Sequence, residues 1–178
     1  TKVLELTPTP PANAFVTDED LEKDQLAFSL DLFFCETCSH VQLCDVIDPE
    51  ILFSDYVYVS GTSKAFVQHF KKYAHDIQLR MPASPKSRLV IDIGSNDGTL
   101  LAQFKSLGFE VLGVDPAKKI ACQASKDGIP TWPDFFDVNI ATKIRSEFGF
   151  AQIITANNVF AHVDDLVGIV EGVRSLLV

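Results

Sequence analysis

Short apolar runs alternate with amphipathic stretches along the second half of the chain, and this rhythm constrains the fold more than any other feature. Four runs have strand character: 88–93, 110–114, 129–132 and 151–156. Helical patterns fill the intervals and continue after the last run, at 99–107, 117–126, 138–148 and 165 onward. Strands that alternate with helices favour a parallel, doubly wound sheet with right-handed crossovers. The sequence therefore predicts an α/β, Rossmann-like fold, incomplete because four strands are few for such a sheet.

Three segments of different character divide the chain. Residues 1–63 combine prolines, acidic residues and short extended runs, which indicates a small irregular module. Apolar residues recur at helical spacing over 64–80, with Ser63 as the expected N-cap, and Pro82 ends the pattern. We therefore expect a linking helix and linker at 64–87, followed at 88–178 by the N-terminal part of the Rossmann-like domain.

Composition excludes several classes of function. The net charge is -9 and no run of Lys and Arg occurs, so no nucleic acid is expected as a partner. No stretch approaches the ~20 apolar residues that cross a bilayer, and the N-terminus lacks the pattern of a signal peptide. We therefore expect a cytoplasmic protein with no membrane partner. The start at Thr1 without methionine and the end at Val178 within an apolar helical pattern suggest a fragment.

The turn after the first of the four strands carries the strongest local signal for a ligand. Its candidate binding residues are Asp92, Gly94, Ser95, Asn96, Asp97 and Gly98. Glycines let the backbone approach a ligand, and the following helix N-terminus offers free N–H donors. A dinucleotide fingerprint would need glycines where Asn96 and Thr99 stand, so NAD is disfavoured.

Asp115 ends the second strand of this region. A carboxylate at that position can accept both hydroxyls of a ribose. Together with the glycine turn it marks an adenosine-binding site. The alternative is that Gly94 and Gly98 only form a tight turn and that Asp115 is a turn residue before Pro116.

Polar residues also follow the fourth strand. Asn157, Asn158 and His162 stand where open α/β sheets present side chains to ligands. The carboxylates of Asp164 and Asp165 could hold the histidine in its loop, or it could face a substrate. Position alone favours neither role.

Three of the four cysteines lie within ten residues of one another. Cys35 and Cys38 form a C-x-x-C knuckle, which brings two thiolates to one tetrahedral zinc and supplies half of a structural site. Cys44 or His40 could complete it locally, but a second pair upstream of Thr1 explains the spacing better. A redox C-x-x-C would require a thioredoxin-like context that is absent here, and buried thiols are the plainer alternative.

Tyr56 and Tyr58 alternate along an extended segment and so lie on one face of it. This pair is compatible with packing between domains and equally with a place beside the substrate.

Seven motifs appear in one order over nearly the whole chain, and together they resemble the sugar C-methyltransferase family. The motifs are PANAF at 11–15, the Cys35/Cys38 knuckle with VQL at 41–43, YVYVS at 56–60, DIGSNDGTL at 92–100, VLGVDPA at 111–117, GIPT at 128–131 and NNVFAH at 157–162.

The resemblance implies an S-adenosylmethionine-dependent enzyme that methylates a carbon of a nucleotide-linked 4-keto-deoxysugar. It implies that the turn at 92–98 holds the methionine part of the cofactor and that Asp115 holds its ribose. It implies a zinc bound by two C-x-x-C pairs, of which this sequence contains one. His162 matches a family histidine near the substrate, and Tyr58 or Tyr56 matches an active-site tyrosine.

The same resemblance implies that the catalytic base lies beyond Val178, since full-length members continue to a Tyr-His-Glu-His-like segment. The competing interpretation is a non-catalytic zinc-knuckle and Rossmann module that binds an adenosine compound or a protein. A nicotinamide-dependent sugar oxidoreductase is a third, disfavoured by Asn96 and Thr99.

Overall fold

The computed structural model describes residues 1–82 and 84–178. The chain divides into two compact units, Thr1–Tyr56 and Val57–Val178. Residues 57–63, which the sequence analysis grouped with the first module, therefore fold with the second unit. The physical reason is a tertiary contact: the backbone of Ser60 and Gly61 is hydrogen-bonded to side chains of the turn at Asn96 and Asp97.

The first unit contains a small antiparallel sheet of order β1-β2-β3. Its strands have three residues each: β1 Lys2–Leu4, β2 Leu32–Phe34 and β3 Val41–Leu43. A 3-10 turn at Asp18–Asp20 and the short helix α1, Pro49–Phe53, complete the unit. Every residue from 1 to 56 is exposed or half-buried, so this unit has no buried core.

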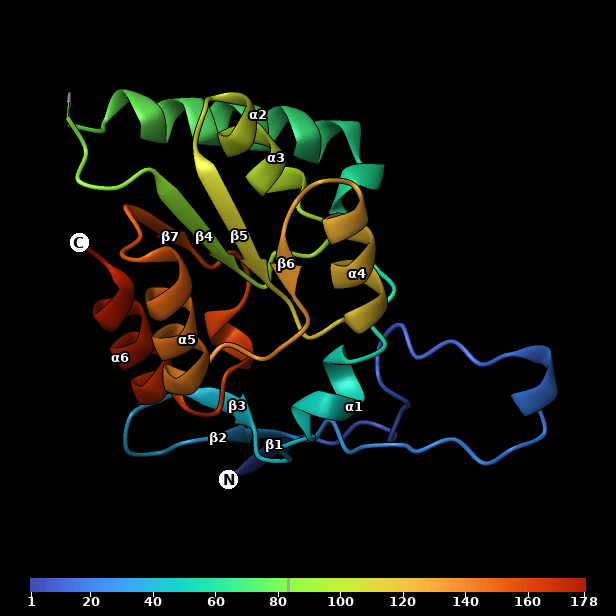
Figure 1. Ribbon diagram of the computed structural model, residues 1–178. Coiled ribbons are helices and arrows are strands. Elements are labelled where there is room, and N and C mark those ends of the chain that lie inside the picture. The colour runs from blue at the N-terminus through green and yellow to red at the C-terminus, as the bar shows by residue number, and fades with distance from the viewer. Residues whose placement is uncertain (83) are drawn as a thin grey trace. The chain divides into compact units, whose positions relative to one another are not determined.

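A parallel four-stranded sheet organises the second unit, with the order β6-β5-β4-β7 (Figure 1). The strands are β4 Leu89–Ile93, β5 Glu110–Val114, β6 Thr131–Trp132 and β7 Ile153–Thr155. All three pairings are parallel. The predicted α/β, Rossmann-like sheet is therefore confirmed, with the first strand of the region at its centre.

Helices cover both faces of this sheet, as Figure 1 shows. Their bounds are α2 Lys64–Leu79, α3 Thr99–Ser106, α4 Lys118–Lys126, α5 Val138–Phe148 and α6 Leu166–Leu176. Val90 packs with residues of α2 and α3, whereas Leu89 and Ile91 pack with residues of α5 and α6. Successive strand residues thus enter opposite layers, as the two-residue period of a strand requires.

Side chains cap the starts of α2 and α6, and the first of these caps, Ser63, is the one that the sequence predicts. The Ser63 hydroxyl accepts the Phe66 N–H at the start of α2, and the Asp165 carboxylate accepts the Gly168 N–H at the start of α6.

Among the described residues, no helix combines the length and apolar character needed to cross a membrane.

Candidate functional site

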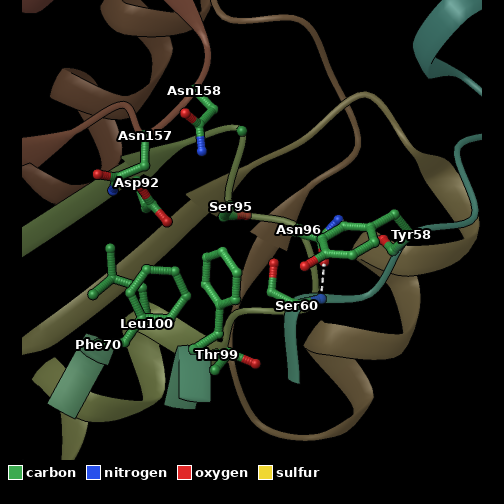
Figure 2. A pocket seen from close by; sticks show the side chains of 12 residues that line it. Tyr58, Ser60, Phe70, Asp92, Ser95, Asn96, Thr99, Leu100, Asn157 and Asn158 are labelled. Atoms are coloured by element: carbon green, nitrogen blue, oxygen red, sulfur yellow. Dashed lines mark hydrogen bonds between the residues drawn. The ribbon is translucent and has the colours of Figure 1, made fainter. Parts of the chain in front are cut away.

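A cavity of about 270 Å³ opens at the carboxyl end of β4. One wall is polar and contains Asp92, Asn157 and Asn158, while Phe70 and Leu100 contribute an apolar wall (Figure 2). All residues that line the cavity belong to the second unit. Carboxyl ends of parallel strands are where open α/β sheets bind ligands, so this cavity is the candidate functional site.

The turn after β4 brings its backbone close to neighbouring elements. Gly94 has φ +69°, and a Cβ there would lie 2.6 Å from Cγ2 of Val159, so a larger residue does not fit. Ser95 follows, and its buried hydroxyl has no hydrogen-bond partner among the described residues. A buried polar atom without a partner costs free energy, and this hydroxyl lies against β5, where a Cβ at Gly113 would clash with it.

Asp92 is buried at the end of β4 and lines the cavity. Its carboxyl accepts a hydrogen bond of 2.6 Å from the Thr155 hydroxyl on β7. Burial raises the pKa of Asp92 to about 7, against the effect of the Thr155 bond, and the nearby Asp115 carboxylate adds to the rise. The carboxyl is therefore divided between its neutral and charged forms near neutral pH.

Asp115 lies at the end of β5 and is also buried. One oxygen accepts the Asn96 N–H at 2.7 Å, and the other accepts the Ala117 N–H at 2.9 Å. Burial raises the pKa of Asp115, and these two bonds oppose the rise. The side chain does not line the cavity at β4. Its oxygens keep further acceptor capacity, because each carboxylate oxygen has two lone pairs.

Asn96 and Asp97 use their side chains within the protein. The Asn96 amide oxygen accepts the Ser60 N–H at 2.9 Å, and its NH₂ group donates to the Tyr58 carbonyl at 2.8 Å. The Asp97 carboxylate accepts the Gly61 N–H at 2.7 Å and the Thr99 N–H at 3.1 Å. Both residues are predicted to bind the ligand; the structure shows their side chains bonded to the backbone, and Asn96 also lines the cavity.

The structure places only some of the predicted site residues at the cavity. The lining residues include Asn157 and Asn158, predicted for the cofactor, and Tyr58, predicted for catalysis. Tyr58 is 42% exposed. His162 is exposed in the 3-10 turn Phe160–His162 and is not a lining residue. Tyr56 belongs to the first unit, where its ring packs edge-on against Phe53.

Phe66 and Phe70 line the cavity from α2, where the sequence pattern predicts only apolar positions of a helix. Their rings meet edge to face with centroids 5.6 Å apart. Two aromatics at i and i+4 in the first turns of a helix share one face. That spacing predicts the shared face, but not the cavity in front of it.

The cysteine knuckle occupies the turn between β2 and β3. The N–H groups of Cys38 and Thr37 donate to the Cys35 sulfur and hold the pKa of that thiol below its usual value. The backbone also closes around the turn, since Ser39 has φ +60° and donates its N–H to the Cys35 carbonyl. Such a turn suits a metal-bound thiolate. The described residues hold no cluster of three or more metal-ligating side chains.

An open, doubly wound sheet with a cavity at a glycine turn defines a nucleotide-binding type of domain. Residues 66–177 match the family described as "Methyltransferase domain", and residues 1–53 match the one described as "Putative zinc binding domain". The chain belongs to the methyltransferase-domain family, as the resemblance implied.

One curated relative and one solved structure show how far the likeness extends. The C-methyltransferase NovU of Streptomyces niveus is 33% identical over 169 residues, which is 95% of this chain and 40% of NovU. This chain therefore spans about two fifths of that relative. A crystal structure of the plantazolicin methyltransferase BpumL, in complex with a triazolic desmethylPZN analog and SAH, matches with a TM-score of 0.51. That match has 17% identity and covers 67% of this chain and 46% of the other, which shows a shared fold.

Proposed function

We propose that the second unit binds S-adenosylmethionine at the carboxyl ends of β4 and β5 and serves a C-methyltransferase. The membership in the methyltransferase-domain family and the likeness to NovU support the class of reaction. The observation that carries the proposal is the cavity at the carboxyl end of β4, where the polar side chains of Asp92, Asn157 and Asn158 lie beside the Gly94 turn. A ligand that carries polar groups and lies close to the protein backbone at the Gly94 turn fits that arrangement.

The cofactor supplies an electrophilic methyl group on a sulfonium. In this proposal, the residues of the cavity wall hold its amino-acid part. The Asp92 carboxyl in its charged form attracts the ammonium group, and Asn157 and Asn158 offer amide donors and acceptors. The remaining lone pairs of Asp115 accept the ribose hydroxyls at the end of β5. The N–H groups at the start of α3 favour the negative carboxylate end.

The proposed substrate is a nucleotide-linked 4-keto-deoxysugar. Its ketone acidifies the neighbouring C–H, a base takes that proton, and the enolate carbon then forms a bond to the methyl as the C–S bond breaks. Tyr58 is the candidate beside the cavity for contact with this substrate. His162 is proposed as a polar group that stabilises the enolate or shuttles its proton. The zinc, held in part by Cys35 and Cys38, would be structural.

Calorimetric titration of the chain with S-adenosylhomocysteine, the product form of the cofactor, tests this proposal, with NADH as the control ligand. We expect binding of the former alone. Asp115→Ala should weaken that binding about tenfold or more, because it removes a charged acceptor of hydrogen bonds. Asp127→Ala is the matched control, since Asp127 is exposed at the end of α4 and pairs with Gln123. Unchanged affinity in a folded Asp115→Ala protein would contradict the ribose assignment.

A further inference from the structure

Residues 58–61, here called the strap, are bonded to the turn after β4 although about 36 residues separate the two in sequence. Three hydrogen bonds join them. Asn96 accepts from the Ser60 N–H and donates to the Tyr58 carbonyl, and Asp97 accepts from the Gly61 N–H. Figure 2 shows the bond between Asn96 and Ser60 at the edge of the cavity.

Both partners of this contact are shaped for close approach. Asn96 has φ +52°, a left-handed conformation that asparagine tolerates better than most residues. On the strap, a Cβ at Gly61 would lie 2.6 Å from an Asp97 carboxylate oxygen and 2.8 Å from the Thr99 hydroxyl. A side chain at Gly61 would therefore push the strap away from the turn.

The same contact builds the cavity. Tyr58 and Ser60 are lining residues, and their backbone groups are the ones that Asn96 holds. The backbone N–H of Asn96 also donates to Asp115, so this one residue connects the end of β5 with the strap. By contrast, the Ser95 hydroxyl has no partner in the described structure. The side chains of Asn96 and Asp97 are thus engaged within the protein.

We propose that Asn96 and Asp97 are positioning residues: their side chains fasten the strap to the turn and so hold Tyr58 and Ser60 at the cavity wall. This inference rests on the proposed function, because the cavity wall formed by Tyr58 and Ser60 is the one that would face the cofactor or the substrate. Asn96 is itself a lining residue, and in this proposal its side chain and that of Asp97 shape the cavity and do not contact the bound molecule.

Amide-resolved hydrogen exchange of the ligand-free chain tests the fastening. In Asn96→Gly, which keeps the left-handed backbone, exchange at Gly61 should accelerate about tenfold, although Asn96 does not bond to that amide. In Asp97→Asn, one oxygen cannot serve both Gly61 and Thr99, and exchange at Ser60 should accelerate similarly. Asn13→Gly is the control, because Asn13 in the first unit also has positive φ. Acceleration confined to the amide that lost its own partner would overturn the proposal.

Titration with S-adenosylhomocysteine distinguishes positioning from direct contact. Asn96→Gly and Gly61→Ala should each weaken binding about three- to tenfold, and the double variant should be no weaker than the worse single one, because both disrupt one contact. Full affinity in Gly61→Ala together with a loss in Asn96→Gly would show that Asn96 touches the ligand and would overturn the proposal. If the wild-type chain does not bind, the cofactor proposal fails separately, and the exchange data alone accept or reject the fastening.

Discussion

Residues 1–56 and residues 57–178 differ in where their large apolar side chains lie. In the second unit, side chains such as Phe104, Leu112 and Ile144 are fully buried in layers on both faces of the sheet. In the first unit no residue is buried, and Phe15 and Val46 expose 80% and 77% of their surface. The two units therefore rely on different sources of stability.

This difference bears on how the cysteine knuckle could stabilise the first unit. A unit of 56 residues whose three-residue strands bury no core gains little from the hydrophobic effect. A metal that links distant ligands stabilises such small units directly. The Cys35 and Cys38 turn is formed in the first unit. The proposed zinc would therefore stabilise this unit in place of a hydrophobic core.

The largest expected effect is on the free energy of unfolding, and it compares one phenylalanine from each unit. Phe104→Ala should lower the free energy of unfolding by about 3 to 5 kcal/mol, because it leaves a cavity beside Phe109 in the buried core. Phe15→Ala should change it by less than about 0.5 kcal/mol, since that ring is exposed. Denaturant unfolding followed by circular dichroism measures both. Equal effects of the two substitutions would contradict the comparison.

The second prediction uses the opposite pKa shifts of carboxyl groups in the two units. Asp92 has a pKa of about 7 in the folded state, against 3.8 ordinarily, so the folded chain holds a proton that the unfolded chain has released. Its contribution therefore falls as pH rises from about 4 to about 7, by a few kcal/mol in total. Asp92→Asn should remove this dependence and leave the weaker one from Asp115, whose pKa is also raised.

The matched carboxyl in the first unit is Asp31, whose pKa is lowered by a hydrogen bond from Lys2. Its stabilising contribution is present above the ordinary pKa and is lost as pH falls, which is the opposite sign. Asp31→Asn should therefore affect only the acid limb of the profile. Unfolding measured from pH 3 to 8 for both variants checks this, and an unaltered slope near neutral pH in Asp92→Asn would refute the buried-carboxyl argument.

The smallest expected change concerns zinc. Elemental analysis of the purified chain should give well under one zinc per molecule, because Cys35 and Cys38 supply two of the four ligands that a tetrahedral site needs. Cys35→Ser should abolish what is bound, and Cys122→Ser, on the exposed side of α4, should not. A full equivalent would show that Cys44 or His40 completes the site within these residues.

The sequence by itself determined the elements of the second unit. The expected strand at 110–114 and helix at 138–148 coincide with β5 and α5, and the expected helix at 99–107 differs from α3 by one residue. The reason is that burial on a sheet imposes local periods on the chain, and these can be read without knowing any partner. The Gly94 and Gly98 turn was predictable for the same kind of reason, because positive φ selects glycine locally.

Only the tertiary structure decided how the side chains at the cavity are used. Asn96 and Asp97 are predicted to bind a ligand from their position, and the structure adds hydrogen bonds from their side chains to backbone about 36 residues away. Phe66 becomes part of the cavity wall, His162 does not, and Asp92 acquires a pKa near 7 through burial. These outcomes depend on contacts between segments distant in sequence and on the loss of water around a charge. Neither these long-range contacts nor this desolvation produces a periodic pattern in the sequence.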